Sequence, residues 1–175
     1  MGKYIACICE GGAERAILDL LLDNNKLIFE REQLIEEEII ECRKGKDFEE
    51  KYLRKGFEGK ITIYRVLDSR SEKFNLSKAY EHKVDIKNVI TAPEIEKLII
   101  CNEGKYKDYQ KEKRKNPKLK PSIYCKVNLK YNNVKRYDFI KGYFSDMEVL
   151  INALHEYRRI SKVHKNEMSI WDLLR

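Results

Sequence analysis

The feature that most constrains the fold is the junction at residues 3–23, where an apolar run meets two glycines and then a helix with one apolar face. Residues 3–9, KYIACIC, have the character of a buried strand. Gly11 and Gly12 allow a sharp turn. Residues 13–23 then repeat apolar side chains at intervals of three and four, which predicts a helix.

The same alternation of strand and helix continues along the chain. Further strands are predicted at residues 26–29, 60–69 and 84–92, and helical segments at 31–55, 71–82, 93–103 and 145–162. The segment 122–130 fits either a strand or the start of a helix. This order predicts an α/β, Rossmann-like layer fold with a mainly parallel central sheet flanked by helices.

We expect a single domain over residues 1–175, because 175 residues suffice for one hydrophobic core. It would carry a basic insertion at about 104–121 and a C-terminal helical region at about 145–175, whose apolar tail docks on the body. No apolar run approaches the roughly 20 residues that span a bilayer. With no visible signal peptide, we expect a cytoplasmic protein without a membrane partner.

The five cysteines do not predict a zinc site or a disulfide framework. Their number is odd and no C-x-x-C pair occurs. Cys7 and Cys9 fall in the first predicted strand, so we interpret them as reduced core residues.

Three carboxylates are placed where a site could form. Glu10 ends the first predicted strand, Glu14 lies one turn into the following helix, and Asp68 ends the strand at 60–69. Ligand sites of parallel sheets lie at the carboxyl ends of strands. If the two strands are neighbours, the carboxylates converge and would repel one another unless a cation lay between them. Mg²⁺ is the natural ion for such a set.

Each of these residues also has a purely structural explanation. Glu14 could simply favour the positive end of a helix dipole. Asp68, followed by Ser69, could form a turn or a helix cap. Glu10 is harder to explain in this way, because it stands between a buried strand and two glycines.

The segment CICEGGAE with its following helix, together with YRVLDSR after a later strand, resembles the Toprim fold of topoisomerases, primases and related nucleases. It is most similar to the small Toprim nucleases of the overcoming-lysogenization-defect type and to the RloB-like proteins of bacterial defence and restriction loci. PEIEKLII resembles the Pro-x-x-Glu helix start of RloB-like proteins, at Pro93 and Glu96. The resemblance covers roughly residues 3–100.

The resemblance implies metal-dependent phosphodiester chemistry with Mg²⁺ or Mn²⁺. Glu10 would take the family's acid–base or metal role, and Glu14 and Asp68 would be metal ligands. The second Asp of the family's Asp-x-Asp is Arg70 here. Glu72 could replace that ligand, or Arg70 could contact a phosphate directly. A third alternative is that the fold persists without catalysis.

A local excess of positive charge suggests a polyanionic partner. The net charge is +7, and residues 105–120 hold eight Lys or Arg against one Asp and one Glu. We expect a flexible basic loop that holds DNA or RNA, with Tyr106 and Tyr109 able to stack on bases. The predicted nucleic-acid-binding residues are Arg70, Lys111, Lys113, Arg114, Lys115, Lys118 and Lys120. The alternative is an ordinary solvated loop.

Three functions follow from these features. The first is a metal-dependent nuclease of bacterial or phage defence. The second is a catalytically inactive protein that binds nucleic acid. The third is a subunit that works with an ATPase partner, for which the acidic segment 31–41 could be a docking surface. That segment could equally pack its apolar side chains on its own sheet.

Overall fold

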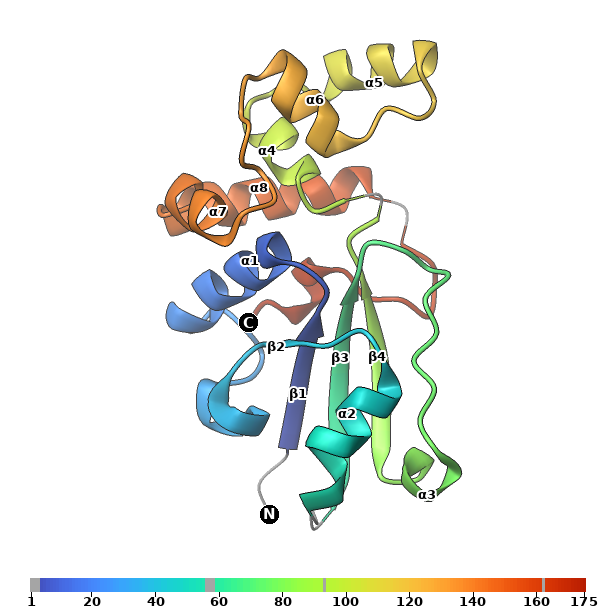
Figure 1. The fold of residues 1–175 in the computed structure, drawn as a ribbon. Helices are drawn as coiled ribbons and strands as arrows, with labels where there is room; N and C mark the ends of the chain where they lie inside the picture. The colour runs from blue at the N-terminus through green and yellow to red at the C-terminus, as the bar shows by residue number, and fades with distance from the viewer. Residues whose placement is uncertain (1–3, 56–58, 93, 162) are drawn as a thin grey trace.

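The computed structural model describes residues 4–55, 59–92, 94–161 and 163–175, and its described strands form one parallel sheet in the order β2-β1-β3-β4 (Figure 1). The strands are β1 (Tyr4–Cys9), β2 (Ile40–Glu41), β3 (Ile61–Leu67) and β4 (Val84–Ile90). In the register, Tyr4 pairs with Ile61, and Ile61 in turn pairs with Val84. The α/β class with a parallel central sheet is therefore confirmed.

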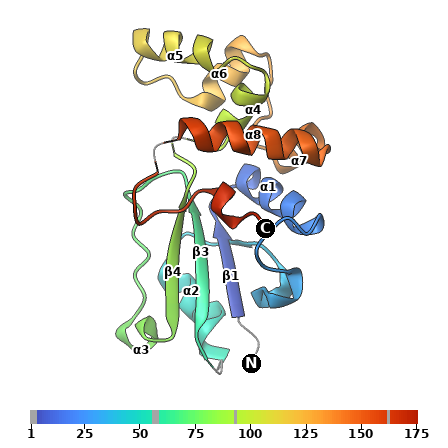
Figure 2. The ribbon, with the colours of Figure 1, turned by 180° about the vertical axis from the view of Figure 1, so that it is seen from behind.

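Helices cover both faces of this sheet and also its carboxyl edge. Helix α1 and the C-terminal segment lie on one face and α2 on the other, while α4 to α8 stand beyond the carboxyl ends of the strands (Figures 1 and 2). The α-helices of the described residues are α1 (Gly12–Asp23), α2 (Gly45–Lys51), α3 (Lys78–Glu81), α4 (Lys97–Asn102), α5 (Tyr106–Lys115), α6 (Pro121–Asn128), α7 (Tyr137–Tyr143) and α8 (Met147–Ile160). The 3-10 turns are η1 (Arg31–Gln33), η2 (Ile35–Glu37), η3 (Leu53–Lys55) and η4 (Ile170–Leu173).

Strand β1 is apolar throughout because both of its faces are covered. Ile5, Cys7 and Cys9 belong to the core on the α1 side, and Ala6 and Ile8 to the core on the α2 side. Such two-sided burial is typical of parallel sheets. Cys7 and Cys9 are buried and free, which confirms their interpretation as core residues.

The predicted strand at 26–29 is wrong, and the helical region predicted at 31–55 is confirmed only in its second part, where α2 covers Gly45–Lys51. Leu27 forms only an isolated antiparallel bridge with Leu174, and the strand that joins the sheet is β2. The segment between them makes two 3-10 turns, since Glu36 and Glu37 have positive φ angles of 58° and 55° that interrupt a helix. Its apolar residues Leu34, Ile35, Ile39 and Ile40 are buried, so they pack within this chain.

The basic stretch is largely helical instead of a loop. Residues 106–115 form α5, which carries ion pairs one turn apart between Lys111 and Asp108 and between Lys115 and Glu112. The ambiguous segment 122–130 is mostly the helix α6. Helix α8 confirms most of the helix predicted at 145–162.

The predicted helix start at Pro93 lies outside the described residues, and α4 begins at Lys97. In the part of the chain that the structure describes, every helix is too short or too polar to cross a membrane.

Candidate active site

The strand order places the ends of β1 and β3 side by side at a topological switch point. The chain leaves β1 toward β2 on one side and returns to β3 on the other side of β1. Glu10 follows β1 directly and Asp68 follows β3. In open parallel sheets, ligands bind in the crevice that forms at such a point.

A pocket of about 170 Å³ lies at this edge, and we call it the carboxylate pocket. It is lined by Glu10, Gly11, Gly12, Ala13, Glu14, Arg43, Asp68, Glu96 and Lys135. The structure thus brings together the three acids that sequence reasoning singled out. It adds a fourth acid, Glu96, and two cations, Arg43 and Lys135.

The carboxyl group of Glu10 lies in a setting that disfavours its charge. Its Oε1 atom is buried, and no described residue hydrogen-bonds to it. Burial, a hydrogen bond with Glu72 and the charges of Glu72 and Asp68 raise the pKa of Glu10 from 4.5 to about 8, against the opposing effect of Arg43. A buried carboxylate oxygen without a partner is costly unless a cation or a proton compensates it.

Glu14 and Glu96 face the pocket from two different helical segments. Glu14 is in the first turn of α1 and is 7% exposed, and Glu96 comes just before α4 and is 4% exposed. Burial is the main reason that the pKa of each rises to about 7, and the charge of Asp68 adds to it. The negative charge of Glu96 also contributes to the raised pKa of Glu14.

Lys135 is held at the pocket by a buried acid, Glu94. The Nζ atom of Lys135 lies 3.1 Å from Oε1 of Glu94, which is 3% exposed. The other oxygen of Glu94 accepts a hydrogen bond of 3.0 Å from the backbone N–H of Ser122. Because Ser122 is in the first turn of α6, Glu94 ties the start of α6 and the loop of Lys135 to the entrance of α4.

Gly12 lies where α1 closely approaches the same loop. A Cβ atom at this position would lie 3.3 Å from the backbone nitrogen of Tyr137 and 3.5 Å from the carbonyl oxygen of Lys135. The glycine therefore lets the first turn of α1 pack closely against the backbone that carries Lys135. This close approach brings Glu14 and Lys135 to one pocket.

The donor chemistry of the pocket fits a hard divalent cation. Four carboxylates line it, and oxygen donors of this kind suit Mg²⁺. Among the described residues, however, no three Asp, Glu, His or Cys side chains are already gathered into a group that could hold a metal. The carboxylates would have to draw together to bind a cation, and the buried Oε1 of Glu10, to which no described residue hydrogen-bonds, could serve as one of its oxygen donors.

Two predicted residues lie outside the wall of this pocket. Glu72 is beside it, close enough to hydrogen-bond with Glu10. Arg70 is engaged elsewhere: its Nε and Nη2 donate hydrogen bonds of 2.7 and 2.9 Å to the two carboxylate oxygens of Glu167. The side chain that stands in place of a second Asp thus ties the end of β3 to the C-terminal segment.

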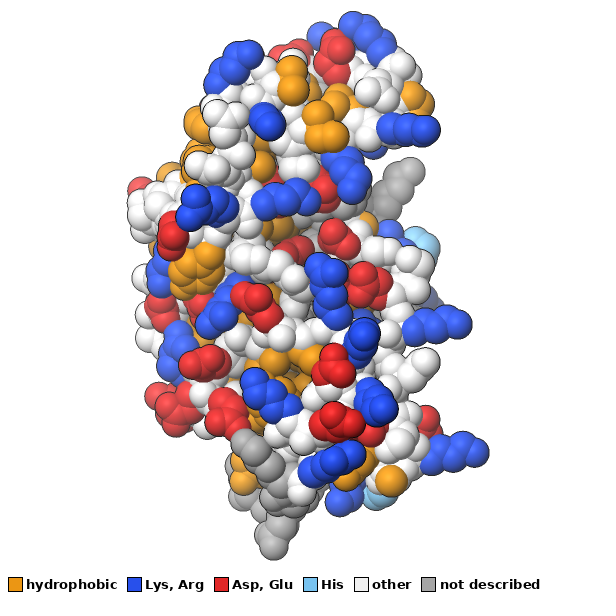
Figure 3. All heavy atoms as spheres, viewed as in Figure 1, with side chains coloured by type: hydrophobic (Ala, Val, Ile, Leu, Met, Phe, Trp, Pro, Cys, Tyr) orange, Lys and Arg blue, Asp and Glu red, His pale blue; other side chains and the backbone are white. Residues whose placement is uncertain are grey.

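The predicted basic residues do not line the carboxylate pocket. The six are Lys111, Lys113, Arg114, Lys115, Lys118 and Lys120, on α5 and in the turn before α6. Lys120 contacts a residue that supports the pocket: its Nζ is 3.7 Å from Oε1 of Glu94, the acid that also holds Lys135. Figure 3 shows Lys and Arg side chains projecting from this end of the molecule. Tyr109 is 4% exposed, so it is a core residue and not a free stacking platform.

Sequence reasoning assigned no role in the site to Glu96, Arg43 or Lys135. Glu96 did carry a signal, because it is the acid of the Pro-x-x-Glu resemblance. Arg43 and Lys135 carried none: they are two of 36 Lys and Arg residues, and only the packing of distant segments brings them to the strand ends.

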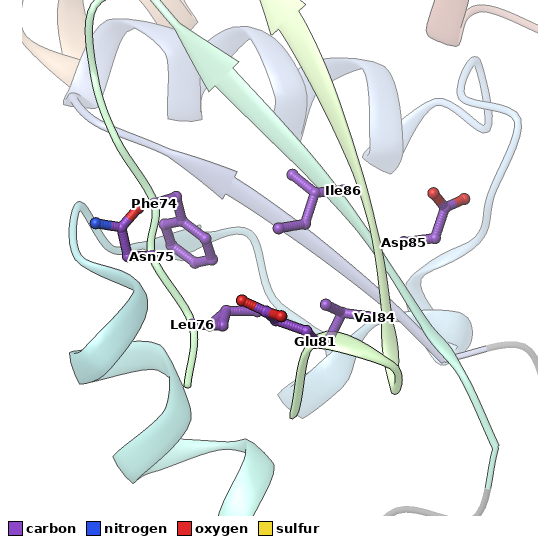
Figure 4. A pocket seen from close by; sticks show the side chains of 7 residues that line it. All are labelled: Phe74, Asn75, Leu76, Glu81, Val84, Asp85 and Ile86. Atoms are coloured by element: carbon purple, nitrogen blue, oxygen red, sulfur yellow. The ribbon is translucent and has the colours of Figure 1, made fainter. Parts of the chain in front are cut away.

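A larger pocket, of about 390 Å³, has a different chemistry. Figure 4 shows it beside the first half of β4, lined by Phe74, Asn75, Leu76, Glu81, Val84, Asp85 and Ile86. It lies toward the amino end of β4, away from the switch point, and no cation lines it. Size alone therefore does not identify the site, and we regard the smaller carboxylate pocket as the candidate.

The Toprim resemblance depends on short motifs in this chain. The structure places three of their acids, Glu10, Glu14 and Asp68, around one pocket, while Arg70 departs from the pattern. Membership of that family remains a prediction. No protein-family model, no curated protein and no solved structure matches the chain.

Proposed function

We propose that this chain is a nuclease that hydrolyses the phosphodiester bonds of DNA or RNA with Mg²⁺ or Mn²⁺ as cofactor. The supporting observation is the carboxylate pocket, where four acids and two cations meet at the switch point of a parallel sheet. The biological setting, bacterial or phage defence, depends on the resemblance of the sequence motifs alone.

The residues of the pocket divide into two roles. Glu10, Glu14, Asp68 and Glu96 supply oxygen donors for the cation. A bound Mg²⁺ or Mn²⁺ would stabilise the charge on the phosphate and make water a better nucleophile. Arg43 and Lys135 would attract the phosphodiester and orient it toward the acids.

Glu10 is also suited to move a proton. A carboxyl group whose pKa is about 8 keeps its proton near neutral pH, whereas an approaching cation favours the ionised form. Its pKa therefore shifts toward the working pH when charge enters the pocket. General acid–base catalysis is most efficient for a group tuned in this way.

The test is a cleavage assay on end-labelled single-stranded and double-stranded DNA and RNA. We expect cleavage only with Mg²⁺ or Mn²⁺, and its rate should fall at least about 100-fold in Glu10→Gln and in Asp68→Asn, because each removes a charged oxygen donor. Glu81→Gln is the matched control, since Glu81 is an exposed acid of the pocket in Figure 4.

Two results would contradict the proposal. One is the absence of cleavage by the unaltered chain with either metal. The other is cleavage that persists in Glu10→Gln and Asp68→Asn at the rate of the Glu81→Gln control, which would identify a contaminating nuclease.

The second candidate function is binding of nucleic acid without catalysis. Arg70 in place of a second Asp favours it, as does the dispersed arrangement of the acids among the described residues. It predicts salt-sensitive binding that survives Glu10→Gln and Asp68→Asn but weakens when the lysines of 111–120 are neutralised. An ATPase partner remains a further prediction: the isolated chain would then be inert and cleave only in the complex.

A further inference from the structure

A second pocket, lined by residues of opposite charge, adjoins the carboxylate pocket in the sequence: Glu96 lines the first pocket and Lys97 the second. It measures about 280 Å³ and is lined by Lys97, Tyr106, Tyr109, Gln110, Lys113 and Arg114. Three cations and no acid line it, whereas the carboxylate pocket holds four acids. We call it the cationic pocket; Glu96 and Lys97, adjacent at the start of α4, belong to the two sites.

Lys97 is unusual because it is a charged residue that is buried at the start of a helix. It is 6% exposed, and no described residue offers it a hydrogen bond or a carboxylate. Its ammonium instead lies over two aromatic rings, 5.4 Å from the centroid of Tyr106 and 5.2 Å from that of Tyr157. Cation–π contacts offset only part of the free-energy cost of burying the ammonium group, so an anion bound beside Lys97 would be stabilised by its charge.

The other walls of the cationic pocket are held in place by contacts of their own. Lys113 donates a hydrogen bond of 2.7 Å from Nζ to the carbonyl oxygen of Leu119. Gln110 donates one of 3.1 Å to the hydroxyl of Tyr106, which fixes that ring beside Lys97. The pocket is therefore a built feature of α4 and α5 and not a gap between loose side chains.

The positive charge of α5 is concentrated on the side of this pocket. Lys105 and Lys111 both lie within 4 Å of Asp108, and Lys115 pairs with Glu112 at 2.9 Å. These pairs offset part of the positive charge on the rest of the helix surface. Arg114, by contrast, is exposed at the rim of the cationic pocket.

We propose that the cationic pocket binds a phosphate group, with Lys97 at its base and Arg114 at its rim. The phosphate could belong to the backbone of a nucleic-acid strand or to a free mononucleotide, which present the same group. That the ligand is a nucleic-acid strand rests on the proposed function, because a strand bound here would also place one of its phosphates next to the carboxylate pocket. Phosphate binding itself needs no catalysis.

Binding titrations without metal test this proposal, because they exclude cleavage. The probes are inorganic phosphate, a nucleoside monophosphate and a fluorescent single-stranded oligonucleotide. We expect Lys97→Met and Arg114→Gln each to weaken binding about tenfold, because each removes a direct phosphate contact. Lys107→Gln is the matched control: this exposed lysine of α5 does not line the pocket, and we expect less than about a twofold change.

A melting curve of each variant separates binding from folding. Lys97→Met replaces a buried charge by an apolar side chain of similar length, so it should keep or raise the melting temperature while it weakens binding. Arg114→Gln is an exposed change that provides a second measurement should Lys97→Met fold poorly. Binding by all three probes would indicate a mononucleotide site, and binding by the oligonucleotide alone a strand site.

The proposal is overturned if Lys97→Met and Arg114→Gln bind all three probes as tightly as Lys107→Gln does. This outcome is distinct from failure of the nuclease. A chain that never cleaves but needs Lys97 to bind would refute only the nuclease. Metal-dependent cleavage with binding indifferent to Lys97 and Arg114 would refute only the cationic pocket.

Discussion

At the scale of single residues, three carboxyl groups of the carboxylate pocket keep their protons to a higher pH than ordinary glutamates do. Glu10, Glu14 and Glu96 all have raised pKa values, to about 8 for Glu10 and about 7 for the other two, chiefly because burial disfavours their charge. In the unfolded chain, such carboxyl groups release their protons near pH 4.5. Between these values the folded protein holds protons that the unfolded chain has lost, so the free energy of unfolding falls as the pH rises.

This linkage predicts the pH dependence of thermal stability. Without metal, the melting temperature should be higher at pH 6 than at pH 8, because all three groups titrate in or near this window. Millimolar Mg²⁺ should raise the melting temperature more at pH 8 than at pH 6, since the cation competes with protons for the same oxygens. Circular dichroism melts at the two pH values measure both effects.

Glu10→Gln is the informative variant in these melts. It removes the group with the largest shift, so the difference between pH 6 and pH 8 should shrink, whereas Glu81→Gln should leave it unchanged. A melting temperature that rises from pH 6 to pH 8 in the metal-free protein would contradict this account of the pocket.

At the same scale, the sequence identified the acids that follow strands and missed their partners. Glu10 and Asp68 could be predicted, because each ends an apolar run that is recognisable by itself. Arg43, Lys135 and Lys97 could not, since their roles arise from contacts between segments far apart in the chain. A lysine becomes exceptional only when the fold buries it, and burial of one lysine leaves no local signal.

At the scale of elements, apolar patterns predicted the strands of the sheet better than the segments between them. The predicted strands at 60–69 and 84–92 contain β3 and β4. Strand β3 is buried along its whole length, whereas β4, at the edge of the sheet, is exposed in its middle and buried only at Val89 and Ile90. Helix α5 was missed because it has few apolar residues. Its side chains instead pair with one another along its surface, and the buried Tyr109, with the partly buried Tyr106, anchors it in the core.

Gly45 also shows how an element depends on its neighbour. Glycine is a poor helix former, yet Gly45 is the first residue of α2. A Cβ atom at Gly45 would lie 2.3 Å from the carbonyl oxygen of Asn75, too close for any side chain. The glycine is needed so that the start of α2 can pack on the extended segment around Asn75.

Two glycine-to-alanine changes should therefore have opposite effects on stability. Gly45→Ala should lower the free energy of unfolding by about 1–3 kcal/mol, because the backbone at Asn75 must move. Gly142, inside α7, has open space around its would-be Cβ, so Gly142→Ala should raise it by about 0.5–1 kcal/mol. Urea denaturation measures both, and equal effects of the two changes would refute the packing argument.

At the scale of the whole molecule, the sheet order decides where chemistry can occur. The sequence predicted an alternation of strands and helices, but an alternation is compatible with several strand orders. The order β2-β1-β3-β4 follows from the return of the chain across β1, and this return alone creates the switch point between Glu10 and Asp68. The sequence motif drew attention to Glu96, and the three-dimensional structure shows that it lines the same pocket as Glu10 and Asp68.

The C-terminal segment is joined to the turn that follows α1, on the face of the sheet that α1 covers (Figure 2). The backbone N–H of Ile28 donates to the carbonyl oxygen of Leu173 at 2.8 Å, and that of Arg175 donates to Lys26 at 2.8 Å. Met168 adds hydrogen bonds to the edge of β4. The docking of the apolar tail, expected from the sequence, is confirmed, and it links the first helix to the last strand.

This junction predicts that the tail contributes to global stability. Leu173 is fully buried, so Leu173→Ala should lower the free energy of unfolding by about 2–5 kcal/mol through lost apolar contact and a cavity. Its neighbour Leu174 is only partly buried, and Leu174→Ala should cost about 1 kcal/mol. Both substitutions keep the backbone bonds of the segment, so their difference in urea denaturation isolates the packing of one side chain. A tail that merely rests on the surface would give two equal and small effects, whereas a tail that completes the core must give unequal ones.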